Sequence, residues 1–306
     1  MTAQRPVLVL ANPAAGSAEQ DRLDEVRRAL SSRAPAGVEI RTPGSDRDYT
    51  EVVAGVAGRD VVVLGGDGSV HRLLQELSGQ GLLERCGAVG VVPMGTGNDL
   101  ARGEGLPLRW QDAVPVAVGG RPSPRGLLVD DDGEVVVNVV HAGVAAEATA
   151  YASEVKGLLG RTAYAVGALR AGLTAQGWHL RVVVDGRPVA DGSDRVLMVS
   201  VALGPSVGGG TPIAPQARPD DGLVDVVVAH GTSPGARIGF ARDLRRGRHT
   251  DRADVTTVRG AEVLVEAVGP EDAFRVNTDG DVADDRLTAR RWRFSPEAWT
   301  LRTPSG

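Results

Sequence analysis

The sequence contains one cysteine, Cys86, and one lysine, Lys156. A single thiol excludes an intramolecular disulfide framework and a cysteine-based zinc site, and it suits a reducing cytosol, so we expect a cytoplasmic location. No GxxxxGK[ST] segment is present, so the sequence lacks a P-loop. The GxGxxG dinucleotide fingerprint is also missing after the first predicted strand.

Long hydrophobic runs are absent too. The apolar stretch VLVLA near the N-terminus is too short for a signal peptide or a membrane span, and no other stretch reaches spanning length. We therefore expect no transmembrane segment, and any contact with a membrane should be made from one side. The net charge of −5 gives no electrostatic reason to expect nucleic acid as a partner. The oligomeric state has no signature in the sequence.

The first 125 residues alternate apolar runs with helical patterns. The runs are rich in β-branched residues without polar alternation, which is typical of parallel strands covered on both faces. We predict a doubly wound α/β domain at residues 1–125. Its strands are expected at 7–11, 38–42, 61–64 and 88–93. Its helices are expected at 49–57, from the end of the 65–69 turn to about 77, and at 110–118, with a further helix through Leu23, Val26 and Leu30.

The pattern changes after Arg125, where most segments are short and β-rich. Strands that follow strands predict an antiparallel β-sandwich, which we place at residues 126–290. Its strands are expected at 127–129, 134–140, 180–184, 194–202, 223–229, 261–268 and 273–278, with a helical passage at 145–175.

Three glycine-containing loops of the first domain each follow a predicted strand and precede a helix, at 12–17, 65–69 and 95–98. In a parallel sheet all three lie at the carboxyl edge of the strands, where ligands bind in open α/β folds. Glycine lets a phosphate approach the backbone, and the N–H groups of a helix N-terminus attract it. Asp67 would repel a phosphate unless a cation lies between them, so we expect it to act through Mg²⁺. The alternative for Asp67 alone is an N-cap in a tight turn.

These loops resemble the diacylglycerol kinase catalytic-domain family, which includes bacterial lipid kinases, sphingosine kinases and ceramide kinases and is distantly related to NAD kinases. The segment at 65–69, GGDGS, resembles that family's GGDGT, and the segment at 93–102, PMGTGNDLAR, is similar to its PxGTxNDxAR. Farther along, KGLLGRTAY at 156–164, VGGGTPIAPQARPDDGLVD at 207–225 and TDGD at 278–281 resemble later family motifs in the same order.

The resemblance implies an N-terminal α/β domain, a C-terminal β-sandwich, an active site in the cleft between them, and a last segment, about 291–306, that returns to the first domain. It also implies transfer of the γ-phosphoryl group of ATP, with Mg²⁺, to a lipid hydroxyl. The proton-accepting base is carried over to Asp279 and Asp281, where the family's DGE is DGD, and which of the two is the base stays open. The alternative for this segment is a plain β-turn.

By the same resemblance the nucleotide site includes Asp67 together with two hydroxyl residues beyond the glycine loops, Thr42 and Thr96. The alternative for Thr42 is a polar residue at a strand end, and for Asn98 a helix cap. Ser69 replaces the usual Thr, and His71 stands where relatives often carry Asn. The full predicted nucleotide set is Asn12, Pro13, Ala14, Ala15, Gly16, Thr42, Gly65, Gly66, Asp67, Gly68, Ser69, Thr96, Gly97 and Asn98.

A structural Mg²⁺ is implied at the Asp221 side chain with the backbone carbonyls of Arg218 and Leu223, a chemically reasonable oxygen set. The alternative is an Asp-Gly turn before a strand. The lipid acceptor is expected at a membrane surface, with the helical passage and the 208–210 loop as candidate acyl contacts and Arg242–Arg248 as a candidate contact to anionic lipid. The alternatives for the whole protein are an NAD kinase-like enzyme with a soluble substrate and a nucleotide-binding regulatory protein without turnover.

Overall fold

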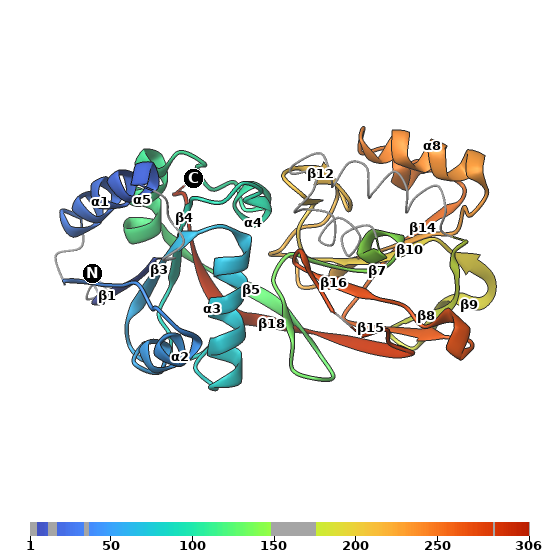
Figure 1. Cartoon of the computed structure of the whole chain (residues 1–306), viewed down its shortest axis with the longest axis horizontal. Coiled ribbons are helices and arrows are strands. Elements are labelled where there is room, and N and C mark those ends of the chain that lie inside the picture. The colour runs from blue at the N-terminus through green and yellow to red at the C-terminus, as the bar shows by residue number, and fades with distance from the viewer. Residues whose placement is uncertain (1–4, 12–16, 34–36, 148–175, 284, 306) are drawn as a thin grey trace. The chain divides into compact units, whose positions relative to one another are not determined.

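The computed structural model describes residues 5–11, 17–33, 37–147, 176–283 and 285–305 (Figure 1). The chain divides into two compact units. The first comprises residues 1–127, 133–137 and 295–306, and the second comprises residues 128–132 and 138–294. The predicted loop at 12–16, most of the helical passage at 145–175, and Lys156 lie outside the described residues. None of the helices that the structure describes is long and apolar enough to cross a bilayer.

The first unit contains a parallel sheet. Its strand order is β2 (Val38–Arg41), β1 (Val7–Ala11), β3 (Asp60–Gly65), β4 (Val89–Pro93) and the last part of β18 (Ala289–Thr303), and these pairings are all parallel. Every residue of β1, β3 and β4 is buried. The prediction of parallel strands covered on both faces is therefore confirmed.

Helices lie on both faces of this sheet (Figure 1). The helices α1 (Ser17–Ser31) and α5 (Trp110–Gly119) share one apolar core with β1 and β3. On the other side α2 (Asp46–Ala54) and α3 (Asp67–Gly79) contact each other. The short helix α4 (Asp99–Gly103) follows the loop after β4. Helix α2 begins three residues before its predicted start because the Ser45 hydroxyl accepts a hydrogen bond from the Asp48 N–H at 3.2 Å.

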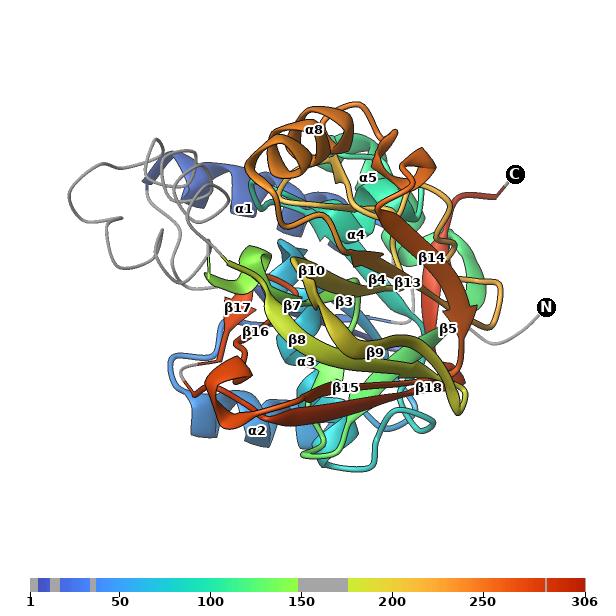
Figure 2. The same cartoon turned by 90° about the vertical axis from the view of Figure 1, so that its right-hand side faces the viewer.

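The second unit is built of antiparallel pairings, which confirms the predicted class (Figure 2). Its six-stranded sheet has the order β14 (Val255–Gly260), β13 (Val224–Ala229), β10 (Met198–Ala202), β7 (Val139–Gly143), β16 (Val276–Thr278) and β17 (Asp281–Val282). A second run of strands joins β9 (Arg187–Val196), β8 (Trp178–Val184), β15 (Glu262–Ala267) and the first part of β18. The second unit also contains the short strands β11 (Ser206–Val207) and β12 (Thr211–Pro212) and the helix α8 (Pro234–Leu244), whereas β6 (Val135–Val136) and most of β5 (Arg121–Asp130) belong to the first unit.

Several element boundaries differ from the prediction. The run 134–140 is two strands, β6 and β7, because the N–H groups of Asn138 and Val139 bond to the carboxylate of Asp279 rather than continuing a ladder. The run 194–202 likewise contains the end of β9 and the whole of β10. The prediction missed β14 and α8, although the start of α8 carries a sequence signal, since Ser233 caps it and Pro234 follows.

Candidate functional site

Asp67 is the first residue of α3, and its carboxylate reaches a second helix. Its Oδ2 accepts a hydrogen bond from the N–H of Asp99 at 3.1 Å, and its Oδ1 accepts one from the N–H of Leu100 at 2.9 Å. Because α4 begins at Asp99, these donors belong to the first turn, where N–H groups have no partner within the helix and where the dipole favours a negative charge. Asp67 therefore connects the loop after β3 to the loop after β4. Its predicted role at Mg²⁺ stays a prediction.

Two glycines bring these loops into backbone contact. A Cβ atom added to Gly66 would lie 2.9 Å from the Cα of Gly95, and one added to Gly95 would lie 2.6 Å from the Cα of Gly66. Both separations are shorter than a carbon–carbon contact allows, so neither position accepts a side chain without moving the other loop. Gly68 differs, since a Cβ there would meet nothing within 4 Å.

The loop after β4 is closed on itself by Asn98, which has a left-handed backbone with φ of 52°. Its side-chain oxygen accepts a hydrogen bond from the N–H of Gly95 at 3.1 Å, and its amide donates to the Gly95 carbonyl at 2.7 Å. Asn98 occupies the N-cap position of α4 without making a side-chain cap bond. The two hydrogen bonds between Asn98 and Gly95 close a small loop and leave Thr96 exposed, which suits the contact to nucleotide predicted for the Thr96 hydroxyl.

A cavity of about 320 Å³ lies in the first unit beside the loop that follows β3. This volume is at the lower end of the range for small-molecule sites, ~300–1,000 Å³. One part of its wall is largely apolar, and the other consists of the glycine loop with a hydroxyl and a guanidinium. The lining residues are Leu10, Ala11, Pro43, Tyr49 and Val63, followed by Gly66, Gly68, Ser69 and Arg72.

Sequence reasoning missed the aromatic and the cationic residue of this cavity. The guanidinium of Arg72 lies 3.9 Å from the centre of the Tyr49 ring, and it bonds to the carboxylate of Asp46 at 2.7 Å. Burial raises the pKa of Tyr49, so the phenol stays neutral at physiological pH. A signal was available, because Arg72 lies four residues after Gly68 and is therefore on the same side of α3.

Thr42 lies one residue beyond the end of β2 and is exposed. Its hydroxyl accepts a hydrogen bond from the Nη2 of Arg27 at 3.2 Å. The neighbouring Pro43 lines the cavity, whereas Thr42 does not. The prediction that Thr42 contacts the nucleotide stays a prediction, as does that for the loop at 12–16, which lies outside the described residues.

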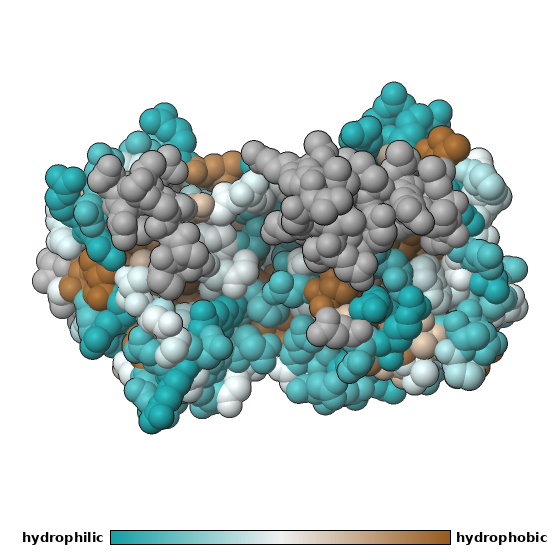
Figure 3. Space-filling view, in the orientation of Figure 1, coloured by the Kyte–Doolittle hydropathy of each residue, from teal (hydrophilic) through white to brown (hydrophobic). Residues whose placement is uncertain are grey.

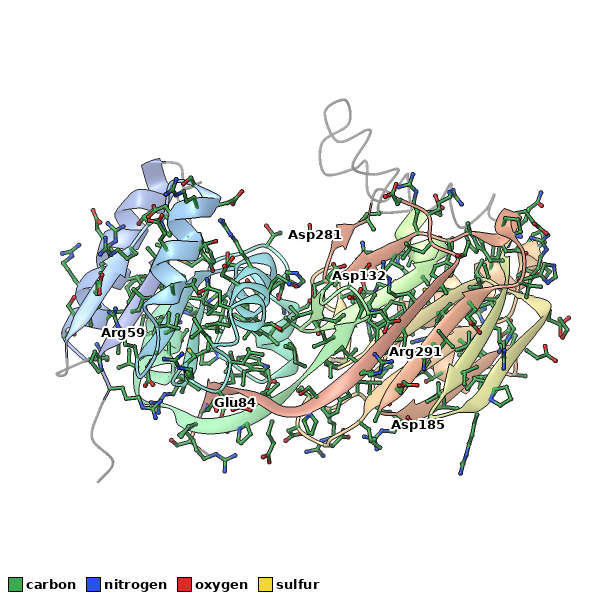
Figure 4. All side chains as sticks on the ribbon, turned by 90° about the horizontal axis from the view of Figure 1, so that it is seen from below. Arg59, Glu84, Asp132, Asp185, Asp281 and Arg291 are labelled. Atoms are coloured by element: carbon green, nitrogen blue, oxygen red, sulfur yellow. The ribbon has the colours of Figure 1, made fainter. Side chains whose placement is uncertain are left out.

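The two aspartates of the TDGD segment differ in their surroundings. Asp279 has a left-handed backbone with φ of 51°, and its Oδ1 accepts hydrogen bonds from the N–H groups of Asn138 at 2.8 Å and Val139 at 2.9 Å. Asp281 is exposed at the start of β17 (Figure 4). Backbone bonds therefore fix the Asp279 carboxylate, whereas the Asp281 carboxylate is accessible to solvent.

His141 is a buried titratable side chain within the second unit. Its Nδ1 lies 2.8 Å from the hydroxyl of Ser200, which is also buried. Burial lowers the pKa of His141 to about 4, and the charge of Asp279 offsets only part of this shift. The imidazole is therefore neutral at physiological pH and does not supply a cation to Asp279.

The segment at 218–223, where the family resemblance places a structural metal, contacts the positive charge of Arg259. The Asp221 carboxylate accepts a hydrogen bond from the Nη2 of Arg259, and its other oxygen lies 3.4 Å from the N–H of Leu223. Arg218 is exposed and pairs with Asp220 at 3.5 Å. Among the residues that the structure describes, no group of three or more His, Cys, Asp or Glu side chains could hold a metal ion. Magnesium at Asp221 stays a prediction.

The contrast between Gly66 and Gly68 gives a test of the nucleotide loop. We expect Gly68→Ala to fold normally, because its Cβ enters open space and alanine favours the helix by about 1 kcal/mol, yet to weaken ATP binding by tenfold or more if phosphate lies there. Gly66→Ala should lower the melting temperature as well, because crowding of this kind costs ~1–3 kcal/mol. Calorimetric titration and thermal melts measure both effects.

Gly79→Ala, at the far end of α3, is the matched control, since its Cβ also meets nothing within 4 Å. Unchanged ATP affinity in Gly68→Ala would show that phosphate does not bind beside the Cα atom of Gly68.

Two family profiles match consecutive parts of the chain. The profile described as the diacylglycerol kinase catalytic domain matches residues 6–128, and the profile described as the YegS C-terminal NAD kinase beta sandwich-like domain matches residues 138–302. The chain is 30% identical over 312 residues to a Pseudomonas aeruginosa protein named "Probable lipid kinase YegS-like", covering 100% of this chain and 96% of that protein. It is 31% identical over 230 residues to a diacylglycerol kinase of Mycobacterium tuberculosis, covering 73% of this chain and 70% of that protein.

A solved structure shows the same fold. The crystal structure of a diacylglycerol kinase from Bacillus anthracis superposes with a TM-score of 0.73 at 20% identity, covering 99% of this chain and 98% of that one. The two profiles and the Pseudomonas aeruginosa relative establish that the chain belongs to the family of diacylglycerol kinase catalytic-domain proteins and YegS-like lipid kinases.

Proposed function

We propose that this protein transfers the γ-phosphoryl group of ATP, bound as its Mg²⁺ complex, to the hydroxyl group of a lipid, with diacylglycerol as the first candidate. The observation that carries the proposal is the pair of glycine loops joined by Asp67 beside the cavity that contains Arg72. Phosphoryl transfer requires positioning and charge neutralisation more than covalent chemistry from the protein. A rigid glycine loop and a cation supply both.

In this proposal the apolar wall holds the base of ATP and the loop at 66–69 holds its phosphates. The first turn of α3 offers N–H groups and a positive dipole end to the phosphates, and the Ser69 hydroxyl adds a donor. Each oxygen of Asp67 accepts one backbone hydrogen bond and keeps a second lone pair, so its carboxylate fits a hydrated Mg²⁺. That ion would neutralise the charge between the β- and γ-phosphates.

We assign the proton-accepting role to Asp281 and a positioning role to Asp279. A base must approach the acceptor hydroxyl within hydrogen-bond distance, which requires an accessible carboxylate. Asp281 is accessible, whereas Asp279 has one oxygen committed to two backbone N–H groups and holds the turn that presents Asp281. The amide of Gly280 donates to the side chain of Asn277 at 3.0 Å, which further fixes this turn.

The lipid assignment is supported by the names of the relatives and by a basic surface segment. Arg245, Arg246 and Arg248 follow α8 and are exposed. The visible surface around α8 combines hydrophilic residues with a hydrophobic patch (Figure 3), and Ile238 of this helix is 61% exposed. Clustered basic residues gain about 1 kcal/mol each near an anionic bilayer, so we assign this segment to contact with the membrane that contains the acceptor, from the cytoplasmic side.

The direct experiment is transfer of labelled γ-phosphate from Mg²⁺–ATP by the purified protein. Mixed micelles would present diacylglycerol, monoacylglycerol, phosphatidylglycerol and sphingoid bases, and NAD would be offered in a parallel reaction. We expect label in a lipid phosphate. Label in NADP would replace the lipid kinase proposal with a soluble-substrate kinase, and ATP binding without any transfer would favour a regulatory protein.

The division of roles between the two aspartates predicts different variant properties. Asp281→Asn should lower kcat by about 10²–10⁴ without changing the melting temperature or ATP affinity, because it removes only the base. Asp279→Ala should lower the melting temperature, because two buried N–H groups lose their acceptor at a cost of ~1–3 kcal/mol. Kinase assays and thermal melts check this. Asp285→Asn, an exposed aspartate nearby in sequence, is the control, and full activity in Asp281→Asn would refute its role as base.

Arg72 should act on the phosphates of the nucleotide rather than on its base. Its ion pair with the fully exposed Asp46 contributes little, so phosphate can recruit the guanidinium at low cost. We expect Arg72→Gln to weaken ATP binding about tenfold while leaving adenosine affinity nearly unchanged, because one charge-assisted contact is lost. The control is Arg47→Gln, an exposed arginine on α2. Equal losses for ATP and adenosine would place Arg72 beside the base.

A further inference from the structure

A cluster of three charged side chains lies in the second unit beside the segment that the family resemblance assigns to a structural metal. Asp225 is in β13 and Arg259 is in β14, and the antiparallel register places these two residues directly opposite each other. Asp221 precedes β13 by three residues. The sheet therefore fixes the backbone of Arg259 beside both carboxylates, independently of any ligand.

The guanidinium of Arg259 is hydrogen-bonded to Asp221 and forms a longer ion pair with Asp225. Its Nη2 donates a hydrogen bond to Oδ2 of Asp221, and its Nε lies 3.6 Å from Oδ2 of Asp225. The three side chains are partly shielded, with exposed fractions of 44% for Arg259, 25% for Asp221 and 16% for Asp225. Shielding of this kind makes the ion pairs stronger than fully exposed ones.

The two carboxylates need a cation. The carboxylates of Asp221 and Asp225 lie beside the same guanidinium, and the Oδ2 atom of Asp225 is buried without a hydrogen-bond partner. Without a positive charge the two aspartates would repel each other in a partly desolvated position. A divalent metal is one way to supply that charge, and a guanidinium fixed by the sheet is another.

We propose that Arg259 is a built-in replacement for the structural metal of this segment, so that the protein maintains the turn before β13 without a bound divalent cation. The guanidinium already occupies one carboxylate oxygen of Asp221, the side chain that the resemblance assigns to the metal, and Mg²⁺ requires near-octahedral oxygen geometry at about 2.0–2.1 Å. A metal at Asp221 would also be repelled by the adjacent positive charge. This inference is independent of the proposed kinase activity and of the Mg²⁺ that accompanies ATP.

Thermal melts without nucleotide test the proposal. A ligand that binds only the folded protein raises its melting temperature, so a metal site is detected as a difference between EDTA and millimolar Mg²⁺ or Ca²⁺. We expect the unmodified protein to melt at the same temperature in both conditions. Arg259→Gln should melt several degrees lower in EDTA and recover with the divalent cation, because the two aspartates then lose the guanidinium that offsets their charges.

The control is Arg181→Gln, which removes an exposed arginine that pairs with Glu266 at 3.7 Å on β15 and should show no metal response. If Arg259→Gln does not fold, equilibrium dialysis of the unmodified protein with Mn²⁺ and no nucleotide replaces it, with Asp221→Asn as the comparison. Equal Mn²⁺ binding by these two proteins supports the proposal. Stoichiometric Mn²⁺ binding that Asp221→Asn abolishes would overturn it, as would a fall in the melting temperature of the unmodified protein in EDTA.

Discussion

The candidate nucleotide site depends on one interaction, the hydrogen bonds that the first turn of α4 donates to the carboxylate of Asp67. It is a charge-assisted bond to two helix N–H groups, made by a residue that itself begins another helix. The bond holds the two glycine loops together while Gly66 and Gly95 allow their backbones to touch. The loop that we propose to hold the phosphates is thus pre-organised by protein groups, which would lower the ordering cost of nucleotide binding.

The second unit uses the same device at its own candidate site. Backbone N–H groups at the break between β6 and β7 bind Asp279, and this leaves Asp281 exposed on the adjacent turn. In each unit an aspartate that the sequence suggests as catalytic, Asp67 or Asp279, accepts hydrogen bonds from backbone N–H groups and so stabilises a turn. In the proposed mechanism the groups that such contacts position, Ser69 and Asp281, act on the phosphate and on the acceptor hydroxyl.

The sequence predicted the class of both units, the strands of the parallel sheet and the glycine loop that lines the cavity, because buried β-branched runs and glycine turns are local signals. It did not predict Tyr49, since the pairing of this ring with Arg72 joins two helices through a contact that no motif encodes. Arg72 itself could have been found from its spacing of four residues after Gly68. Sequence reasoning placed a metal at Asp221 and could not detect Arg259, because that residue reaches Asp221 only through the register of β13 and β14. The partner of Asp67 was missed for the same reason: 32 residues separate it from Asp99 in the chain.

The most direct test of this account measures nucleotide affinity without Mg²⁺ in Asp67→Ala, together with hydrogen exchange at the Asp99 and Leu100 amides. If Asp67 builds the site, both amides should exchange faster and metal-free ATP should bind at least tenfold more weakly, while the rest of the sheet keeps its protection. Wild-type affinity for metal-free ATP, with a loss only for Mg²⁺–ATP, would contradict the account. That result would limit Asp67 to a role at the metal.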